Sequence, residues 1–156
     1  MRKIKRIYVH CSDSAWGTVE ELRRWHMEPP RKWDDIGYHF VITNGYATYA
    51  DKREGDYVED QDGAVHVGRK VEWMGAHVKN DNPNTIGICL IGPPFTDRQL
   101  ESLAEFAAKQ LRAYGLPIEV LLGHREYWIK RNETPKRECP IIDMDAVRAA
   151  VVALNV

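Results

Sequence analysis

The sequence predicts a single α/β domain over residues 1–156, with a central mixed β-sheet flanked by helices. Short runs of β-branched and aromatic residues alternate along the chain with longer amphipathic segments, which is typical of this class. One run, residues 85–91, is almost entirely apolar, as expected of a central strand that is covered on both faces. The length suits one domain, and no internal repeat or linker divides the chain.

The first half is expected to hold three strands and one helix. The strands are predicted over residues 4–10, 37–42 and 64–68. A capping box, Thr18 with Glu21, opens the helix, and the pair Pro29-Pro30 ends it. The polar and acidic residues 51–63 are expected to form a loop or a hairpin.

The second half is expected to hold two strands and two helices. The central strand 85–91 is broken by Gly92-Pro93-Pro94, and the longest helix begins after Thr96 and ends at Gly115. A last strand is predicted over 118–122. A loop and then a helix over about 143–154 complete the chain.

Charge and hydropathy exclude two classes of partner. The chain has 22 basic and 23 acidic residues, so no overall field attracts it to nucleic acid, and we expect no nucleic-acid partner. No apolar stretch of 18 residues exists, so we expect no membrane insertion. The basic segment 1–6 lacks the apolar core of a signal peptide, and we therefore expect synthesis in the cytoplasm.

The three cysteines are Cys11, Cys89 and Cys139; an odd number without a CxxC pair argues against a disulfide framework. Cys89 lies inside the apolar run and is expected in the core. Cys11 adjoins His10 and is expected to point to the opposite face of the strand. Three further histidines have ordinary interpretations. His39 is expected in the core, and His26 and His66 at the surface or half-buried.

Two histidines and one cysteine are the candidates for a metal site. His10 ends the first strand, His124 follows the last one, and Cys139 lies in the late loop. Two imidazoles and one thiolate leave one position of a tetrahedral zinc open to water, as in catalytic zinc sites. The spacing contains no local metal signature, so hydrogen-bonded core histidines and an ordinary loop cysteine remain the alternative from these residues alone.

Six short motifs, taken together and in their order along the chain, are more informative than any one of them. They are Val9–Ser12, Ile36–Phe40, Gly75–His77, Asn84–Ile88, Gly123–Glu126 and Cys139-Pro140. This series resembles the type-2 N-acetylmuramoyl-L-alanine amidases, a family that includes small phage lysozymes and catalytic peptidoglycan recognition proteins. The resemblance spans residues 7 to about 147. It implies the amidase and peptidoglycan-recognition fold, and zinc-dependent hydrolysis of the amide between N-acetylmuramic acid and L-alanine in peptidoglycan.

The resemblance also implies roles for particular residues. It makes His10, His124 and Cys139 the ligands of one Zn²⁺ ion and places Tyr38 beside the metal. His77 matches a histidine of the substrate cleft, and Trp73 flanks a cleft-forming motif and could stack on a sugar ring. Lys136 or Arg137 would stabilise the oxyanion. Because arginine does not release its proton in proteins, an acid role falls to Lys136 or Tyr38.

The chain departs from the family pattern at two places. Ile141 follows Cys139-Pro140, where the family more often has glycine or another small residue. The polar stretch 47–62 is long for the family and is expected to add a hairpin.

Three alternatives to a zinc amidase stay open at this point. Some relatives have lost the cysteine and only bind peptidoglycan, although Cys139 is retained here. A small phage amidase can also inhibit an RNA polymerase, so a polymerase partner is a second alternative. In the third, an unrelated α/β protein uses its histidines and cysteines structurally. The main expectation is a monomer that binds peptidoglycan and acts on the cell wall after release or export.

Overall fold

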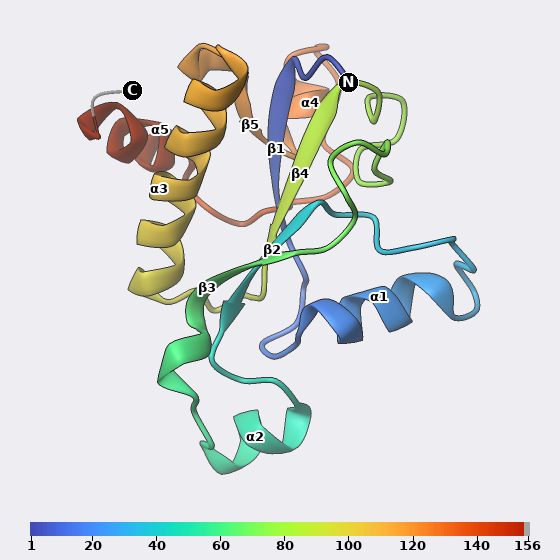
Figure 1. Ribbon diagram of the computed structural model, residues 1–156, viewed down its shortest axis with the longest axis vertical. Coiled ribbons are helices and arrows are strands. Elements are labelled where there is room, and N and C mark those ends of the chain that lie inside the picture. The colour runs from blue at the N-terminus through green and yellow to red at the C-terminus, as the bar shows by residue number, and fades with distance from the viewer. Residues whose placement is uncertain (155–156) are drawn as a thin grey trace.

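A computed structural model describes residues 1–154, so the last two residues of the predicted 1–156 domain lie outside the described part. Five strands form one sheet in the order β3-β2-β4-β1-β5 (Figure 1). They are β1 Arg6–Cys11, β2 Phe40–Asn44, β3 Asp62–Val67, β4 Thr85–Leu90 and β5 Leu121–Gly123. β4 pairs in parallel with β1 and β2, β5 is parallel to β1, and β3 is antiparallel to β2. The predicted mixed sheet is confirmed.

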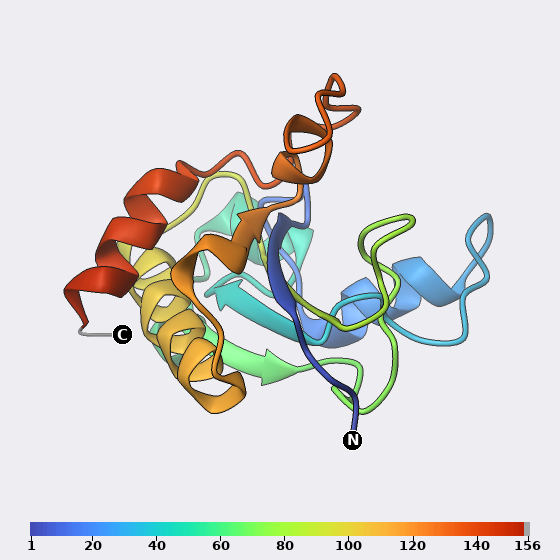
Figure 2. The same cartoon turned by 90° about the horizontal axis from the view of Figure 1, so that it is seen from above.

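Helices cover both faces of this sheet (Figure 2). They are α1 Val19–Met27, α2 Tyr49–Glu54, α3 Asp97–Tyr114, α4 Glu126–Ile129 and α5 Met144–Ala153, with 3-10 turns η1 Glu59–Gln61 and η2 Ile118–Val120. α3 begins at a capping box of Thr96 and Gln99 and ends at Gly115, whose φ is 61°, as the sequence predicts. None of the helices within residues 1–154 is both long and apolar enough to span a bilayer.

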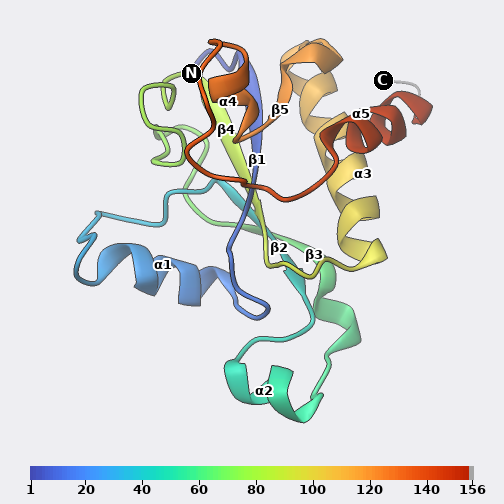
Figure 3. The same ribbon diagram turned by 180° about the vertical axis from the view of Figure 1, so that it is seen from behind.

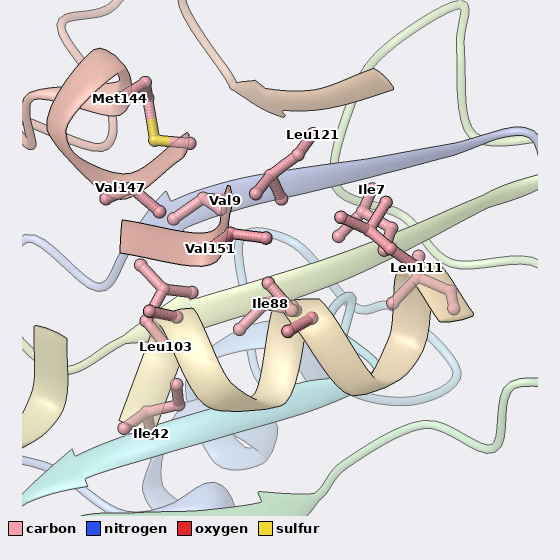
Figure 4. Close-up of a cluster of buried hydrophobic side chains, with 14 of the residues drawn as sticks. Ile7, Val9, Ile42, Ile88, Leu103, Leu111, Leu121, Met144, Val147 and Val151 are labelled. Carbon is pink, nitrogen blue, oxygen red and sulfur yellow. The ribbon is translucent and has the colours of Figure 1, made fainter. Parts of the chain in front are cut away.

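The main core lies between the sheet and the pair α3 and α5 (Figure 4). Ile7 and Val9 of β1 belong to this core, whereas Tyr8 packs in a separate cluster with Leu122 and Val78. Because side chains alternate along a strand, Tyr8 and His10 point away from α3 and α5. We call this side of the sheet, which α1 and the loops cover, the site face.

The second strand begins later than predicted. β2 starts at Phe40, so Tyr38 and His39 precede it and do not lie within it. The segment before it makes a contact with α1 that periodicity does not reveal. His26 Nδ1 accepts the Gly37 N–H at 2.9 Å, which directs this segment toward α1. His26 is therefore buried, with 7% of its surface exposed, and the prediction of a surface or half-buried position was wrong.

The predicted hairpin at 47–62, and the loop or hairpin at 51–63, are also wrong. The segment forms α2 and η1, because Thr48 and Asp51 make a reciprocal capping box and Gly55 ends the helix with a φ of 76°. The last strand is shorter than predicted. Residues 118–120 form the 3-10 turn η2 after Pro117, and β5 begins at Leu121.

Replacing Ile141 with glycine is expected to stabilise the protein. Ile141 has a φ of 61°, in the left-handed region where a Cβ atom causes strain. Its side chain is 53% exposed, so it gains little from burial that would offset this strain. Glycine removes that Cβ at some cost in chain entropy, and we expect the free energy of unfolding to rise by roughly 0.5–1 kcal/mol. Urea unfolding measures this change. Ile141→Ala keeps the Cβ and is the control; equal gains in both variants would argue against strain.

Candidate functional site

Three potential metal ligands from distant parts of the sequence meet at one end of the sheet. One ligand atom each from His10, His124 and Cys139 lies within 4.8 Å of the others. β1 and β5 are parallel neighbours, and His124 N–H donates to the Val9 carbonyl at 3.0 Å. The carboxyl ends of parallel strands meet at the same edge of a sheet, and this pairing brings the two imidazoles together.

The loop from α4 to α5 brings Cys139 to the same place, and Figure 3 shows this loop passing across β1. Two backbone contacts hold it there. Arg125 N–H donates to the Cys139 carbonyl at 2.8 Å, and Cys11 N–H donates to Cys139 Sγ at 3.3 Å. The second contact favours a thiolate, because an N–H donor stabilises a negative sulfur. Cys11 lies outside the three-residue cluster but supports its cysteine.

The spacing of His10 and Cys139 fits zinc. His10 Nδ1 lies 3.8 Å from Cys139 Sγ. Ordinary Zn–N and Zn–S bonds at a tetrahedral angle put such a pair about 3.5 Å apart. His10 is buried, whereas His124 and Cys139 are partly exposed, so the cluster faces solvent on one side. Within residues 1–154, no fourth histidine, cysteine or carboxylate completes the cluster, and one coordination position would stay open.

The electrostatics keep both imidazoles neutral. Burial, reinforced by the Arg137 cation, lowers the pKa of His124 to about 4, and burial with neighbouring histidines holds the pKa of His10 well below its usual range. Neutral imidazole is the form that binds a metal. The Cys11 thiol and burial raise the pKa of Cys139 when no ion is bound. A cation at the cluster would therefore have to stabilise the thiolate form of Cys139.

Tyr38 lies next to this cluster. Its ring centroid is 5.1 Å from that of His10, and its ring is packed between α1 and the sheet. Burial, with the neighbouring thiols Cys89, Cys139 and Cys11, raises the pKa of Tyr38 well above its usual value. The phenol is therefore neutral at physiological pH and can donate its proton in a hydrogen bond.

Of the remaining predicted site residues, three are exposed and one is buried. Arg137 is exposed, and its positive charge contributes to the lowered pKa of His124, a member of the cluster. Lys136 is exposed beside it. Trp73 has 59% of its surface exposed and stacks on no aromatic ring of the described residues. His77 is 8% exposed, and its Nδ1 lies 2.9 Å from His10 Nε2.

Two contacts at the site come from α4, a short helix that the sequence analysis did not predict. Trp128 of this short helix stacks on His124, with ring centroids 4.8 Å apart and planes 21° from parallel. Glu126 accepts the Gly123 N–H at 2.7 Å and pairs with Arg148 at 2.9 Å, which fixes the end of β5. The four-residue spacing of His124 and Trp128, one helical turn, was the available signal.

His39 is expected to make stability depend on pH. It is fully buried, and burial lowers its pKa to about 4. In the unfolded chain His39 becomes protonated below pH about 6.5, whereas in the folded protein it stays neutral until the pH approaches 4. Stability is therefore full above pH about 6.5 and falls as the pH drops toward 4, by at most about 3 kcal/mol from this residue.

Urea unfolding of the wild type and of His39→Gln between pH 7 and pH 4 measures this contribution. The variant is expected to lose less stability over that range than the wild type. Identical slopes for the two proteins would show that His39 does not carry the effect.

Comparisons with known proteins show which sequences this chain resembles. A family model described as N-acetylmuramoyl-L-alanine amidase matches residues 1–140. The endolysin of Escherichia phage T7 is 32% identical over 143 residues, which cover 88% of this chain and 81% of the endolysin. Peptidoglycan-recognition protein LB of Drosophila melanogaster is 32% identical over 124 residues, which cover 76% of this chain and 44% of that protein.

Solved structures share the fold. N-acetylmuramoyl-L-alanine amidase LysC from Clostridium intestinale superimposes with a TM-score of 0.73 at 22% identity, covering 99% of this chain and 87% of LysC. A chain from the complex of peptidoglycan recognition proteins LCa and LCx with tracheal cytotoxin gives 0.63 at 26% identity, covering 90% of this chain and 77% of that one. The predicted fold class is confirmed.

Proposed function

The chain belongs to the N-acetylmuramoyl-L-alanine amidase family and is an amidase of peptidoglycan, and we propose that it is zinc-dependent and cleaves the bond between N-acetylmuramic acid and L-alanine. The observation that carries this proposal is the cluster of His10, His124 and Cys139, whose ligand atoms lie within 4.8 Å of one another and which is partly open to solvent. A site that only stabilised the fold would be closed by a fourth ligand.

His10, His124 and Cys139 would hold the ion. When bound, zinc supplies a Lewis acid that polarises a carbonyl and makes a water molecule acidic near neutral pH. The protein's own contribution is to keep both imidazoles neutral by burial and to hold the sulfur with the Cys11 N–H. Trp128 stacks on His124 and fixes the orientation of that ring.

Two kinds of side chain would stabilise the charge that develops on the substrate carbonyl. The neutral phenol of Tyr38, beside His10, donates a hydrogen bond to that oxygen, and the Arg137 cation stabilises its negative charge. Lys136 can give a proton to the departing amine of L-alanine, which an arginine cannot do. Trp73, exposed on the loop before His77, is available to stack on a sugar ring.

The substrate is a muramyl peptide of the bacterial wall. A structural neighbour binds tracheal cytotoxin, and the phage relatives are endolysins, both of which favour this substrate class. We infer synthesis in the cytoplasm and action on the wall after release or export. A polymerase partner, which the resemblance implies as an alternative, and a monomeric state stay predictions.

Metal analysis of the purified protein tests the zinc requirement. We expect about one zinc per chain, loss of amidase activity after treatment with a chelator, and recovery when zinc is added back. Full activity in a protein that has been shown to contain no metal would refute the proposal. A protein that binds muropeptides but cleaves none, even with zinc bound, would be a binding module.

A further inference from the structure

Behind His10, a row of polar side chains runs along the site face of the sheet. His10 Nε2 lies 2.9 Å from His77 Nδ1, and His77 Nε2 lies 3.1 Å from the Thr85 hydroxyl. The Thr85 hydroxyl in turn lies 2.9 Å from the Asn82 carbonyl and 3.1 Å from the Asp81 carbonyl. The row thus begins at a predicted metal ligand and ends on backbone carbonyls.

The carbonyls set the direction of every hydrogen bond in the row. A carbonyl can only accept, so the Thr85 hydroxyl donates to one of them and accepts the His77 Nε2–H. Neutral His77 then has a bare Nδ1, which accepts the His10 Nε2–H. His10 is left with an unprotonated Nδ1, and this is the nitrogen that faces Cys139 Sγ at 3.8 Å. The row selects the tautomer of His10 that can bind a metal through Nδ1.

The pocket around His77 is built to hold this ring. A Cβ at Gly87 would lie 2.7 Å from His77 Cγ, and a Cβ at Gly75 would lie 2.7 Å from His77 Cδ2. Glycine inside a strand is unfavourable, and here it admits the imidazole against β4. The backbone N–H of His77 and that of Val78 both donate to Asn82 Oδ1, at 2.7 and 2.8 Å, so the loop carrying the ring is fixed as well.

From these contacts we propose that His77 and Thr85 are positioning residues that fix the tautomer and orientation of His10 for metal binding. The 8% exposure of His77 and its contact with His10 favour this role over the substrate contact that the family resemblance implies. The inference rests on the proposed function, because it needs His10 to be a metal ligand. Partners of this kind commonly change metal affinity by about 10–100-fold when they are lost.

Zinc affinity of the full chain, measured by competition with a chromophoric chelator, tests the proposal without relying on activity. Thr85→Val keeps the shape of the side chain but removes the hydroxyl, and we expect it to weaken zinc binding about 10-fold. Thr85→Ser restores the hydroxyl and is expected to bind zinc within about 3-fold of the wild type. His77→Phe fills the pocket without hydrogen bonds, and we expect a loss of about 10–100-fold.

His39→Phe is the matched control. His39 is a second buried imidazole, 5.7 Å from His77 between ring centroids, but it bonds the Gly87 N–H and the Trp73 carbonyl and makes no contact with His10. Its loss is expected to lower stability and leave zinc affinity unchanged. Long-range ¹H–¹⁵N NMR spectra of the zinc-loaded wild type should show His10 protonated at Nε2 only.

Two results would overturn the inference. One is equal zinc affinity in wild type, Thr85→Val and His77→Phe, and the other is a His10 protonated at Nδ1 in the zinc-loaded wild type. If His77→Phe fails to fold, the zinc affinities of Thr85→Val and Thr85→Ser still test the proposal. A wild type that binds no zinc at all would instead refute the proposed function, so the two failures can be told apart.

Discussion

Replacing Cys139 with serine is expected to reduce zinc affinity and to lower amidase turnover by about 10³-fold or more. The loss is large because the three ligands act as a unit, and removing one of them costs about as much activity as removing all three. Cys139 is the only sulfur in the cluster, and a hydroxyl is a far poorer zinc ligand than a thiolate. Its backbone contact with Arg125 does not involve the side chain, so the loop should keep its position. Release of labelled stem peptide from purified peptidoglycan, with zinc content measured on the same sample, gives the result.

Cys89→Ala is the control for this variant. Cys89 is fully buried in β4 and lies outside the metal-ligand cluster, so its loss should cost some stability and leave zinc content unchanged. A Cys139→Ser protein with wild-type turnover would show that the sulfur is not needed for the reaction.

Replacing Tyr38 with phenylalanine is expected to lower kcat by about 10²-fold, with little change in KM or in zinc content. The variant keeps the ring that packs against His10 and removes only the hydroxyl. A hydrogen bond that strengthens as charge develops on the substrate oxygen contributes to kcat rather than to substrate binding. Steady-state kinetics on a soluble muropeptide separate the two constants.

Tyr127→Phe provides the comparison for Tyr38→Phe. Tyr127 is also buried, but it packs with Tyr8 and Leu122, and its substitution should leave both constants near the wild-type values. If Tyr38→Phe raises KM and keeps kcat, the hydroxyl contributes to ground-state binding. If neither constant changes, Tyr38 has no part in the reaction.

Much of the fold follows from local signals in the sequence. Thr96 with Gln99, and Gly115, mark the ends of α3 because capping is a contact between near neighbours in the chain. β4 is recognisable from its almost continuous apolar run, since both of its faces are covered. The metal-ligand candidates have no such local signature; His10 near the end of β1 and His124 just after β5 stood out because chemical groups gather at the carboxyl ends of neighbouring parallel strands, and the family resemblance implied the full set with Cys139.

The errors arise where a contact joins residues that are distant in sequence or where a signal is short. An imidazole from α1 binds the backbone just before β2, and hydropathy does not reveal that contact. α2 was missed because its capping box, Thr48 with Asp51, stands in a polar segment with no buried face. The pocket of His77 depends on Gly87, whose role appears only when the loop before β4 folds back onto the strand.

Mass spectrometry of purified peptidoglycan after incubation with the protein, with and without a zinc chelator, tests the central claim most directly. We expect glycans that end in unsubstituted lactyl-muramyl groups and free stem peptides that begin with L-alanine. Both products should disappear with the chelator and return when zinc is restored. Intact peptidoglycan, or cleavage at another bond or without metal, would contradict the account of His10, His124 and Cys139 as the zinc site of an amidase.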